Sequence, residues 1–207
     1  MTFEAKDILS IHEKLLEAHR IESGYRNKGT VYSIFEKTRL QFMGLELYPT
    51  ATKKAAVLFE GIIRLHPFID GNKRTALAVA QEFLVENNLI FLIPITAVHF
   101  TVQIAKTNVL ESEKIDRLID NIEKWISHRT VPAADIKKIR DLLKKDIDLL
   151  TMLLKISQSN RGIDFLKNTV DYWLAKDIYP DNDIKFEDLI KFHTERLNGI
   201  LKFVQEI

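Results

Sequence analysis

The sequence predicts an all-α fold: a helical bundle with at most a short β-hairpin, followed by a helical C-terminal extension. Glycine and proline, the residues that most often interrupt regular structure, number only 7 and 5 among 207 residues. Apolar residues recur three or four positions apart over several segments, which is the spacing of one helix face. Apolar residues make up 46% and charged residues 29% of the chain, the ordinary balance of a soluble globular protein.

The first two helices are expected on either side of a loop rich in turn-forming residues. Residues 5–19 carry Ile8, Ile11, Leu15 and Leu16 at helical spacing. The stretch IESGYRNKGT follows, and its glycines and asparagine predict an irregular loop. Residues 30–42 are expected to form the second helix, and Pro49 in LELYPT ends that pattern.

Two buried helices are then expected to flank a short polar segment. Thr50 is the predicted N-cap of a helix over residues 51–65, which His66-Pro67 ends. NKRTALAVAQEFLVENN predicts the next helix, whose alanines suit close packing at the centre of a bundle. LIFLIPI has room for a short strand, and helices are expected over residues 96–107 and 112–127.

SHRTVPAAD, at residues 127–135, is the expected domain boundary, since a proline and a change of pattern coincide there. The predicted domains are residues 1–129 and a helical extension over residues 130–207. Apolar residues of the extension recur at alternating steps of three and four, like a short coiled-coil stripe: Ile136, Ile139, Leu143, Ile147, Leu150 and Leu154. Two further helices are expected near residues 162–176 and 184–205.

The charge balance and the missing cysteines exclude several classes of function. Thirty basic and 29 acidic residues leave a net charge of +1, so direct nucleic-acid binding is not expected. Without cysteine there are no disulfides, no thiolate catalysis and no cysteine-ligated zinc. Glu4, Asp7 and Glu13 make the N-terminus unlike a secretory signal, and no apolar run approaches the roughly 20 residues of a membrane span. We therefore expect a cytoplasmic protein without membrane contact.

The segment HPFIDGNKR, residues 66–74, gathers polar side chains where a helix begins. The helix expected from Asn72 leaves its first backbone N–H groups unpaired at the positive end of its dipole, which favours a bound anion. Gly71 lets a phosphate approach the backbone, while Lys73 and Arg74 add positive charge. Gly71, Asn72, Lys73 and Arg74 are therefore the candidate nucleotide-binding residues.

His66 and Asp70 supply the remaining chemistry of the segment. A histidine titrates near neutral pH and is the natural general base for a hydroxyl. Asp70 is a hard oxygen ligand beside the phosphate site, and hence the candidate Mg²⁺ ligand. With Lys73 and Arg74 these two are the candidate catalytic residues for transfer from a nucleotide to a hydroxyl. The structural alternative is a helix end at His-Pro followed by an ordinary Asp-Gly-Asn turn.

HPFIDGNKR also matches the histidine loop of the Fic/Doc (Fido) family, His-x-Phe-x-Asp/Glu-Gly/Ala-Asn-x-Arg. IHEKLLEAH, ESGYRNKG and LYPTATKKAAVLFEGIIRLHPF resemble Doc-type (death-on-curing) members, so the resemblance covers about residues 5–128. It implies a Fido helical fold, ATP and Mg²⁺, and a protein hydroxyl as acceptor. In this resemblance His66 matches the base, Asp70 the Mg²⁺ ligand, and Gly71, Asn72 and Arg74 the phosphate-binding residues.

Two positions bear on which phosphate is transferred. Lys73 stands where Fic AMP-transferases carry a second glycine, as it does in Doc proteins, and Leu77 stands where they carry a second arginine. Lys73 fills space that a phosphate would occupy, and the missing arginine removes a clamp for the far end of the triphosphate. Doc-type members transfer the γ-phosphoryl group, and the Doc prototype phosphorylates a threonine of elongation factor Tu.

The resemblance therefore implies a Doc-like kinase that modifies a Ser/Thr hydroxyl of a target protein, within a toxin–antitoxin or phage-defence system. Protein adenylyl transfer (AMPylation) is the second reading, and a catalytically silent module that binds nucleotide or a partner is the third. An antitoxin partner is implied as well. The extension at residues 130–207 is open to three roles: interaction platform, homodimerisation element or inhibitor in cis.

The remaining candidates receive ordinary interpretations. The loop at residues 23–29 corresponds in the resemblance to the family's flap, which pairs with the backbone of the target. Arg26 in this loop is expected to be solvated. The other histidines show no metal-ligand spacing and are expected at surface or internally satisfied positions: His12, His19, His99, His128 and His193.

Overall fold

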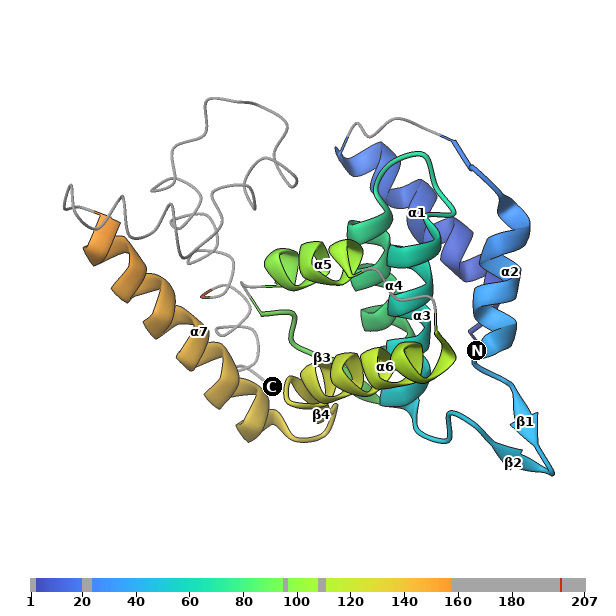
Figure 1. Cartoon of the computed structure of the whole chain (residues 1–207). Coiled ribbons are helices and arrows are strands. Elements are labelled where there is room, and N and C mark those ends of the chain that lie inside the picture. Colours follow the sequence, from blue (N-terminus) through green and yellow to red (C-terminus); the bar gives the residue numbers. More distant parts are fainter. Residues whose placement is uncertain (1–2, 20–23, 95–96, 108–110, 158–197, 199–207) are drawn as a thin grey trace. The chain divides into compact units, whose positions relative to one another are not determined.

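The computed structural model describes residues 3–19, 24–94, 97–107, 111–157 and residue 198 of the chain (Figure 1). The chain divides into two compact units. The first comprises residues 1–93 and 100–133, and the second comprises residues 94–99 and 134–207. All of the candidate site residues lie in the first unit.

The described part of the chain is mostly helical, which confirms the predicted fold class. The helices are α1 (Ala5–His19), α2 (Lys28–Lys37), α3 (Ala51–Leu65), α4 (Asn72–Glu86), α5 (Ala97–Lys106), α6 (Ser112–Ser127) and α7 (Ile136–Ser157). The strands are β1 (Gln41–Phe42), β2 (Leu45–Glu46), β3 (Leu89–Phe91) and β4 (Thr130–Pro132). They form two antiparallel pairs, β1 with β2 and β3 with β4. No helix among these described residues is long and apolar enough to cross a membrane.

Helix α3 is the centre of the first unit and packs against α2, α4 and α6. Every residue from 55 to 63 is buried, so this helix is enclosed on all sides. Its start is fixed as predicted, because the Thr50 side chain accepts a hydrogen bond from the Lys53 backbone N–H at 3.1 Å. Lys53 in turn forms ion pairs with Asp120 and Glu123 of α6. The N-terminus of α3 is therefore tied to α6.

A buried carboxylate joins α2 to α3. Glu60 is only 4% exposed. It lies 2.6 Å from Arg64, one turn further along α3, and 3.4 Å from Lys37 at the end of α2. Two cations thus compensate one buried negative charge, as a buried carboxylate requires. These ion pairs join the end of α2 to the C-terminal end of α3, after which residues 66–71 follow.

The prediction of one helix over residues 30–42 is wrong at both ends. Helix α2 begins at Lys28, where the Asn27 side chain accepts from the Gly29 N–H, and it ends at Lys37. Residues 41–46 form a hairpin instead, with Met43 and Gly44 at positive φ in its turn. The segment LQFMGLEL alternates apolar and polar residues about that turn, which is strand periodicity. Only a few residues carry the alternation, so the helical pattern before it masked the change.

The remaining predicted elements agree with the structure where it describes them. The strand expected in LIFLIPI is β3, and the helices expected at residues 96–107 and 112–127 are α5 and α6. Because β4 pairs with β3, residues 130–132 belong to the first compact unit. The division into domains at residue 129 stays a prediction. The helices expected near residues 162–176 and 184–205 lie outside the described residues.

Candidate active site

The segment at residues 66–71 joins the end of α3 to the start of α4, and both of its ends are held in left-handed backbone. His66 caps α3 with φ 45° and ψ 57°. Gly71 caps α4 with φ 76° and ψ 4°. Left-handed backbone is open to glycine but costs most other residues about 1–2 kcal/mol. The chain therefore turns sharply at His66, whose imidazole is exposed at the loop edge.

The side chain of Asn72 holds this loop from inside. Its amide oxygen accepts from the Phe68 backbone N–H at 3.1 Å, and its amide nitrogen donates to the Phe68 carbonyl at 2.9 Å. Asn72 itself is 6% exposed. Sequence reasoning assigned Asn72 to the nucleotide; the structure places its side chain on the loop backbone, which leaves its backbone N–H for a phosphate.

A second segment braces the loop from outside through backbone hydrogen bonds. The Pro67 carbonyl accepts from the N–H groups of Arg26 and Asn27 at 2.8 and 3.3 Å. The Ile69 N–H donates to the Gly24 carbonyl at 3.2 Å. The bonds form a short antiparallel bridge between residues 24–27 and 67–69. Residues 24–27, which the resemblance assigned to target binding, thus position the histidine loop itself.

His12 of α1 packs under the loop, and sequence reasoning missed this role. It is fully buried, and its ring stacks on the Phe68 ring with centroids 3.7 Å apart and planes 15° from parallel. Its Nδ1 lies 3.0 Å from the Thr75 hydroxyl in the first turn of α4. Desolvation lowers the pKa of His12, against the opposing charges of Glu13 and Asp70. The imidazole is therefore neutral at neutral pH and links α1, the loop and α4.

The signal for His12 was present in the sequence. His12 lies four positions after Ile8, which is fully buried, so the two share the apolar face of α1. Tyr25 adds a further ring beside it, 6.0 Å from His12 and 5.8 Å from Phe68. Desolvation, and then the hydrogen bond that its hydroxyl donates to Glu13, raise the pKa of Tyr25 to about 12. The position of the polar His12 on the buried face of α1 therefore indicated that it contacts another element.

The charges around His66 favour its neutral form. Desolvation lowers its pKa, and the positive charges of Arg26 and Lys73 lower it further. Since a general base must be unprotonated to act, these neighbours keep His66 ready at neutral pH. Arg26 is exposed, as expected for a loop arginine, yet its charge reaches the imidazole.

The start of α4 concentrates positive charge. Gly71 provides no side-chain cap and the first turn of α4 contains no acidic residue. Lys73 and Arg74 occupy that turn and are half-buried. The Nε of Arg74 is buried and has no hydrogen-bond partner within the described part of the chain. A helix N-terminus is stabilised by negative charge, so the first-turn N–H groups and the unpartnered Arg74 Nε make this end of α4 suited to an anion.

Asp70 is the acidic residue of the loop. It is exposed, and its Oδ1 accepts from the Gly71 N–H at 2.5 Å. Its other carboxylate oxygen remains for a cation. Within the described residues, no group of three or more His, Asp or Glu side chains gathers into a metal site. A metal at Asp70 would therefore need most of its ligands from phosphate oxygens and water, as Mg²⁺ in nucleotide sites does.

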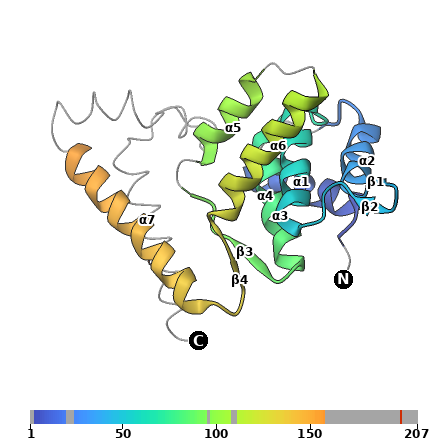
Figure 2. The ribbon, with the colours of Figure 1, turned by 60° about the horizontal axis from the view of Figure 1, so that its bottom comes forward.

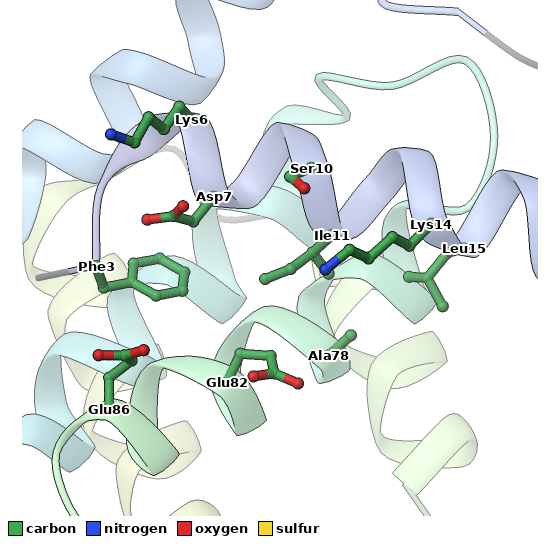
Figure 3. A pocket seen from close by; sticks show the side chains of 10 residues that line it. All are labelled: Phe3, Lys6, Asp7, Ser10, Ile11, Lys14, Leu15, Ala78, Glu82 and Glu86. Carbon is green, nitrogen blue, oxygen red and sulfur yellow. The ribbon is translucent and has the colours of Figure 1, made fainter. Parts of the chain in front are cut away.

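A separate pocket of about 400 Å³ lies between α1 and α4 (Figure 3). Apolar side chains line it together with Lys6, Asp7 and Lys14 from α1 and with Glu82 and Glu86 from α4. The full lining is Phe3, Lys6, Asp7, Ser10, Ile11, Lys14, Leu15, Ala78, Glu82 and Glu86. None of the residues 66–74 lines it, so it is distinct from the histidine loop.

Comparison with known proteins finds a family match over the part of the chain that contains the histidine loop. Residues 2–84 match the family model described as Fic/DOC family. A stretch of 59 residues is 37% identical to the toxin Doc of Mycolicibacterium smegmatis, and it covers 28% of this chain and 45% of that protein. The chain thus spans less than half the length of this curated relative. No solved structure matches.

Proposed function

We propose that this chain, whose N-terminal part is of the Fic/Doc type, transfers the γ-phosphoryl group of ATP to a Ser/Thr hydroxyl of another protein. The observation that carries the proposal is the buried Arg74 Nε, which has no acceptor within the described residues and lies at a helix start without an acidic residue, close to His66. Lys73 and Arg74 oppose the helix dipole instead of complementing it. A polyphosphate supplies both an acceptor for the Arg74 Nε and negative charge at the start of the helix.

In this reaction His66 accepts the proton of the target hydroxyl while the oxygen of that hydroxyl forms a bond to the γ-phosphorus. The bond from the γ-phosphorus to the bridging oxygen breaks, and ADP leaves. Desolvation and the charges of Arg26 and Lys73 lower the pKa of His66, so the imidazole is unprotonated before the substrate binds and is available to accept the proton. Asp70 is the residue that would hold Mg²⁺, which offsets phosphate charge when bound. The first-turn N–H groups and Arg74 orient the phosphates.

The choice of the γ-phosphoryl group over AMP rests on Lys73 and Leu77. Lys73 fills the position where a small residue would admit a phosphate close to the backbone. Leu77 is half-buried and packs against the hydrophobic core of the first unit. No cation therefore extends from position 77, one turn after Lys73, to grip the far end of a triphosphate. Both features disfavour the binding pose that AMP transfer needs.

The test is a labelling experiment with the full chain, cell lysate and Mg-ATP carrying the label at either the α- or the γ-phosphate. Label on protein from γ-labelled ATP alone supports phosphorylation; label from α-labelled ATP refutes it and establishes AMP transfer. His66→Asn is expected to abolish the labelling, whereas His128→Asn, which changes another exposed histidine, leaves it intact. No labelling and no calorimetric binding of ATP would refute both reactions.

The proposal includes a toxin–antitoxin context, in which a peptide of the antitoxin restrains the chain. The α1–α4 pocket of Figure 3 suits such a peptide, because it combines apolar side chains with charged side chains of both signs. Reversing the charges with Lys14→Glu and Glu82→Lys separately should weaken co-purification of an antitoxin co-expressed with this chain. Unchanged co-purification in both variants would remove the pocket from the proposal and leave the reaction chemistry untouched.

A further inference from the structure

The β1–β2 hairpin carries an apolar face that the described residues of the first unit leave largely exposed. Gln41 pairs with Glu46 and Phe42 pairs with Leu45. The Leu47 N–H donates to the Leu40 carbonyl at 2.9 Å, which continues the ladder by one pair. Directly opposed residues of an antiparallel pair share a face, and alternate residues along a strand point to the same side. One face is therefore entirely apolar, formed by Leu40, Phe42, Leu45 and Leu47.

The opposite face of the hairpin is polar and is exposed as well. It consists of Gln41 and Glu46, and Glu46 forms an ion pair at 2.8 Å with Lys54 in the first turn of α3. On the apolar face, Leu40, Phe42, Leu45 and Leu47 are exposed to 47%, 64%, 74% and 49%. A solvated hairpin ordinarily packs its apolar face inward and presents its polar face to water. This hairpin leaves its apolar face exposed instead.

The turn of the hairpin adds a strained apolar residue at the tip. Met43 has φ 50° and Gly44 has φ 78°, the left-handed pair of a two-residue turn in which Asn, Asp and Gly are strongly preferred. Met43 nonetheless occupies the first position and is 87% exposed. Backbone strain and exposure of a large apolar side chain both oppose a methionine here in an isolated molecule. Leu40, Phe42, Met43, Leu45 and Leu47 together are named the hairpin patch.

We propose that the hairpin patch is the contact through which two copies of this chain form a reversible dimer. An apolar, nearly uncharged face is complementary to itself, and a two-fold axis places the same patch on both sides of the contact. The flanking charges are paired within each copy: Glu46 with Lys54, and Arg39 with Glu36 at 3.6 Å. Two identical copies therefore meet without like-charge repulsion, whereas a partner chosen by charge would find little unpaired charge to recognise.

The size of the patch determines the strength of the dimer. Five partly exposed side chains offer a few hundred Å² of apolar surface, the size at which exposed patches tend to be functional. Two such patches bury less than the roughly 1,200 Å² of a stable specific interface. The dimer is accordingly expected to dissociate on dilution, within the micromolar range or above it.

The contact leaves the histidine loop accessible. The hairpin precedes the N-terminus of α3, and the loop follows its C-terminus (Figures 1 and 2). A helix of 15 residues is about 22 Å long. The two features thus lie at opposite ends of α3, and dimerisation does not depend on the proposed reaction.

Sedimentation velocity of the full chain from about 1 to 500 μM tests the proposal. Wild-type protein should shift from monomer to dimer with concentration, and the double variant Phe42→Ser/Leu45→Ser should remain monomeric over the same range. Gln41→Ser, on the opposite face, should dimerise like the wild type. The substituted side chains are exposed, so the variants should keep the wild-type circular dichroism and melting temperature. A wild-type monomer at every concentration, or a dimer unaffected by the double substitution, would overturn the proposal.

Cross-linking supplies a second measurement, because the chain contains no cysteine. A single thiol introduced by Met43→Cys should join two copies through a short bismaleimide at concentrations where the dimer forms. Ser10→Cys, exposed on α1 and away from the hairpin, is the matched control. Equal yields from the two thiols would contradict the proposed contact, and a strong preference for position 43 would support it.

Discussion

Replacing His66 separates its chemistry from its backbone role. The residue has φ 45°, in the left-handed region, and its side chain is exposed. Asparagine and glycine adopt this backbone readily, whereas alanine does not. His66→Asn, His66→Gly and His66→Ala all remove the proposed base, and only the last adds strain.

The expected magnitudes follow from that geometry. His66→Ala should be less stable than His66→Asn by about 1 kcal/mol, which in a chain of this size lowers the melting temperature by roughly 2–4 °C. His66→Gly should fall between them or close to Asn, since relief of strain is offset by the greater freedom of glycine in the unfolded chain. Loss of a general base should reduce transfer by roughly 100- to 10,000-fold in all three variants.

The assay combines thermal unfolding with transfer of label from γ-labelled ATP. Activity close to wild type in the Asn or Gly variant would refute His66 as the base, and equal stability of the Ala and Asn variants would refute the backbone argument. The pH profile gives a further check. Desolvation, Arg26 and Lys73 lower the pKa of His66, so wild-type activity should decline only below about pH 6.5. Arg26→Gln removes one of these charges and should move that decline to higher pH.

Three further predictions concern the supports of the loop. His12→Phe keeps the ring stack on Phe68 but removes the group that can be protonated. Because burial lowers the folded-state pKa of His12, the wild-type free energy of unfolding should fall as the pH drops from about 6.5 through that pKa. The variant should lose less free energy of unfolding over the same pH range in a series of denaturant titrations. Asn72→Ala leaves the buried N–H and C=O of Phe68 unpaired and should cost about 2–4 kcal/mol in urea unfolding, a result that a loss below 1 kcal/mol would contradict. Gly24→Ala introduces a Cβ at φ 147° against the Ile69 side chain of the loop, so it should impair labelling, whereas Gly44→Ala, at positive φ in open space, should cost stability alone.

The helices were predictable because their signals are local. Apolar spacing of three and four residues, the Thr50 cap and the proline after His66 lie within single elements, and α1 and α3 have the predicted bounds. The hairpin was missed because strand periodicity over so few residues is weaker than the helical pattern beside it. Its two-residue turn also lacks the usual residue type, with methionine at the first left-handed position. Local propensity therefore gave no warning of this turn.

The histidine loop was predictable for a different reason. Its residues are contiguous, and each brings a side chain whose chemistry is known without any fold. The supports were not predictable in the same way, because they come from distant parts of the chain. Arg26 affects His66 only through space, and His12 reaches Thr75 across 63 positions.

The sequence by itself determined where most of the described helices lie and which residues have the chemistry to bind phosphate and accept a proton. These properties depend on residue type and on neighbours a few positions away. The tertiary structure alone decided that Asn72 holds the loop, that the ring of His12 stacks on Phe68, and that the apolar face of the hairpin is exposed. Burial and long-range contacts arise only when the elements pack, and they change both the pKa of a group and the partners left to it.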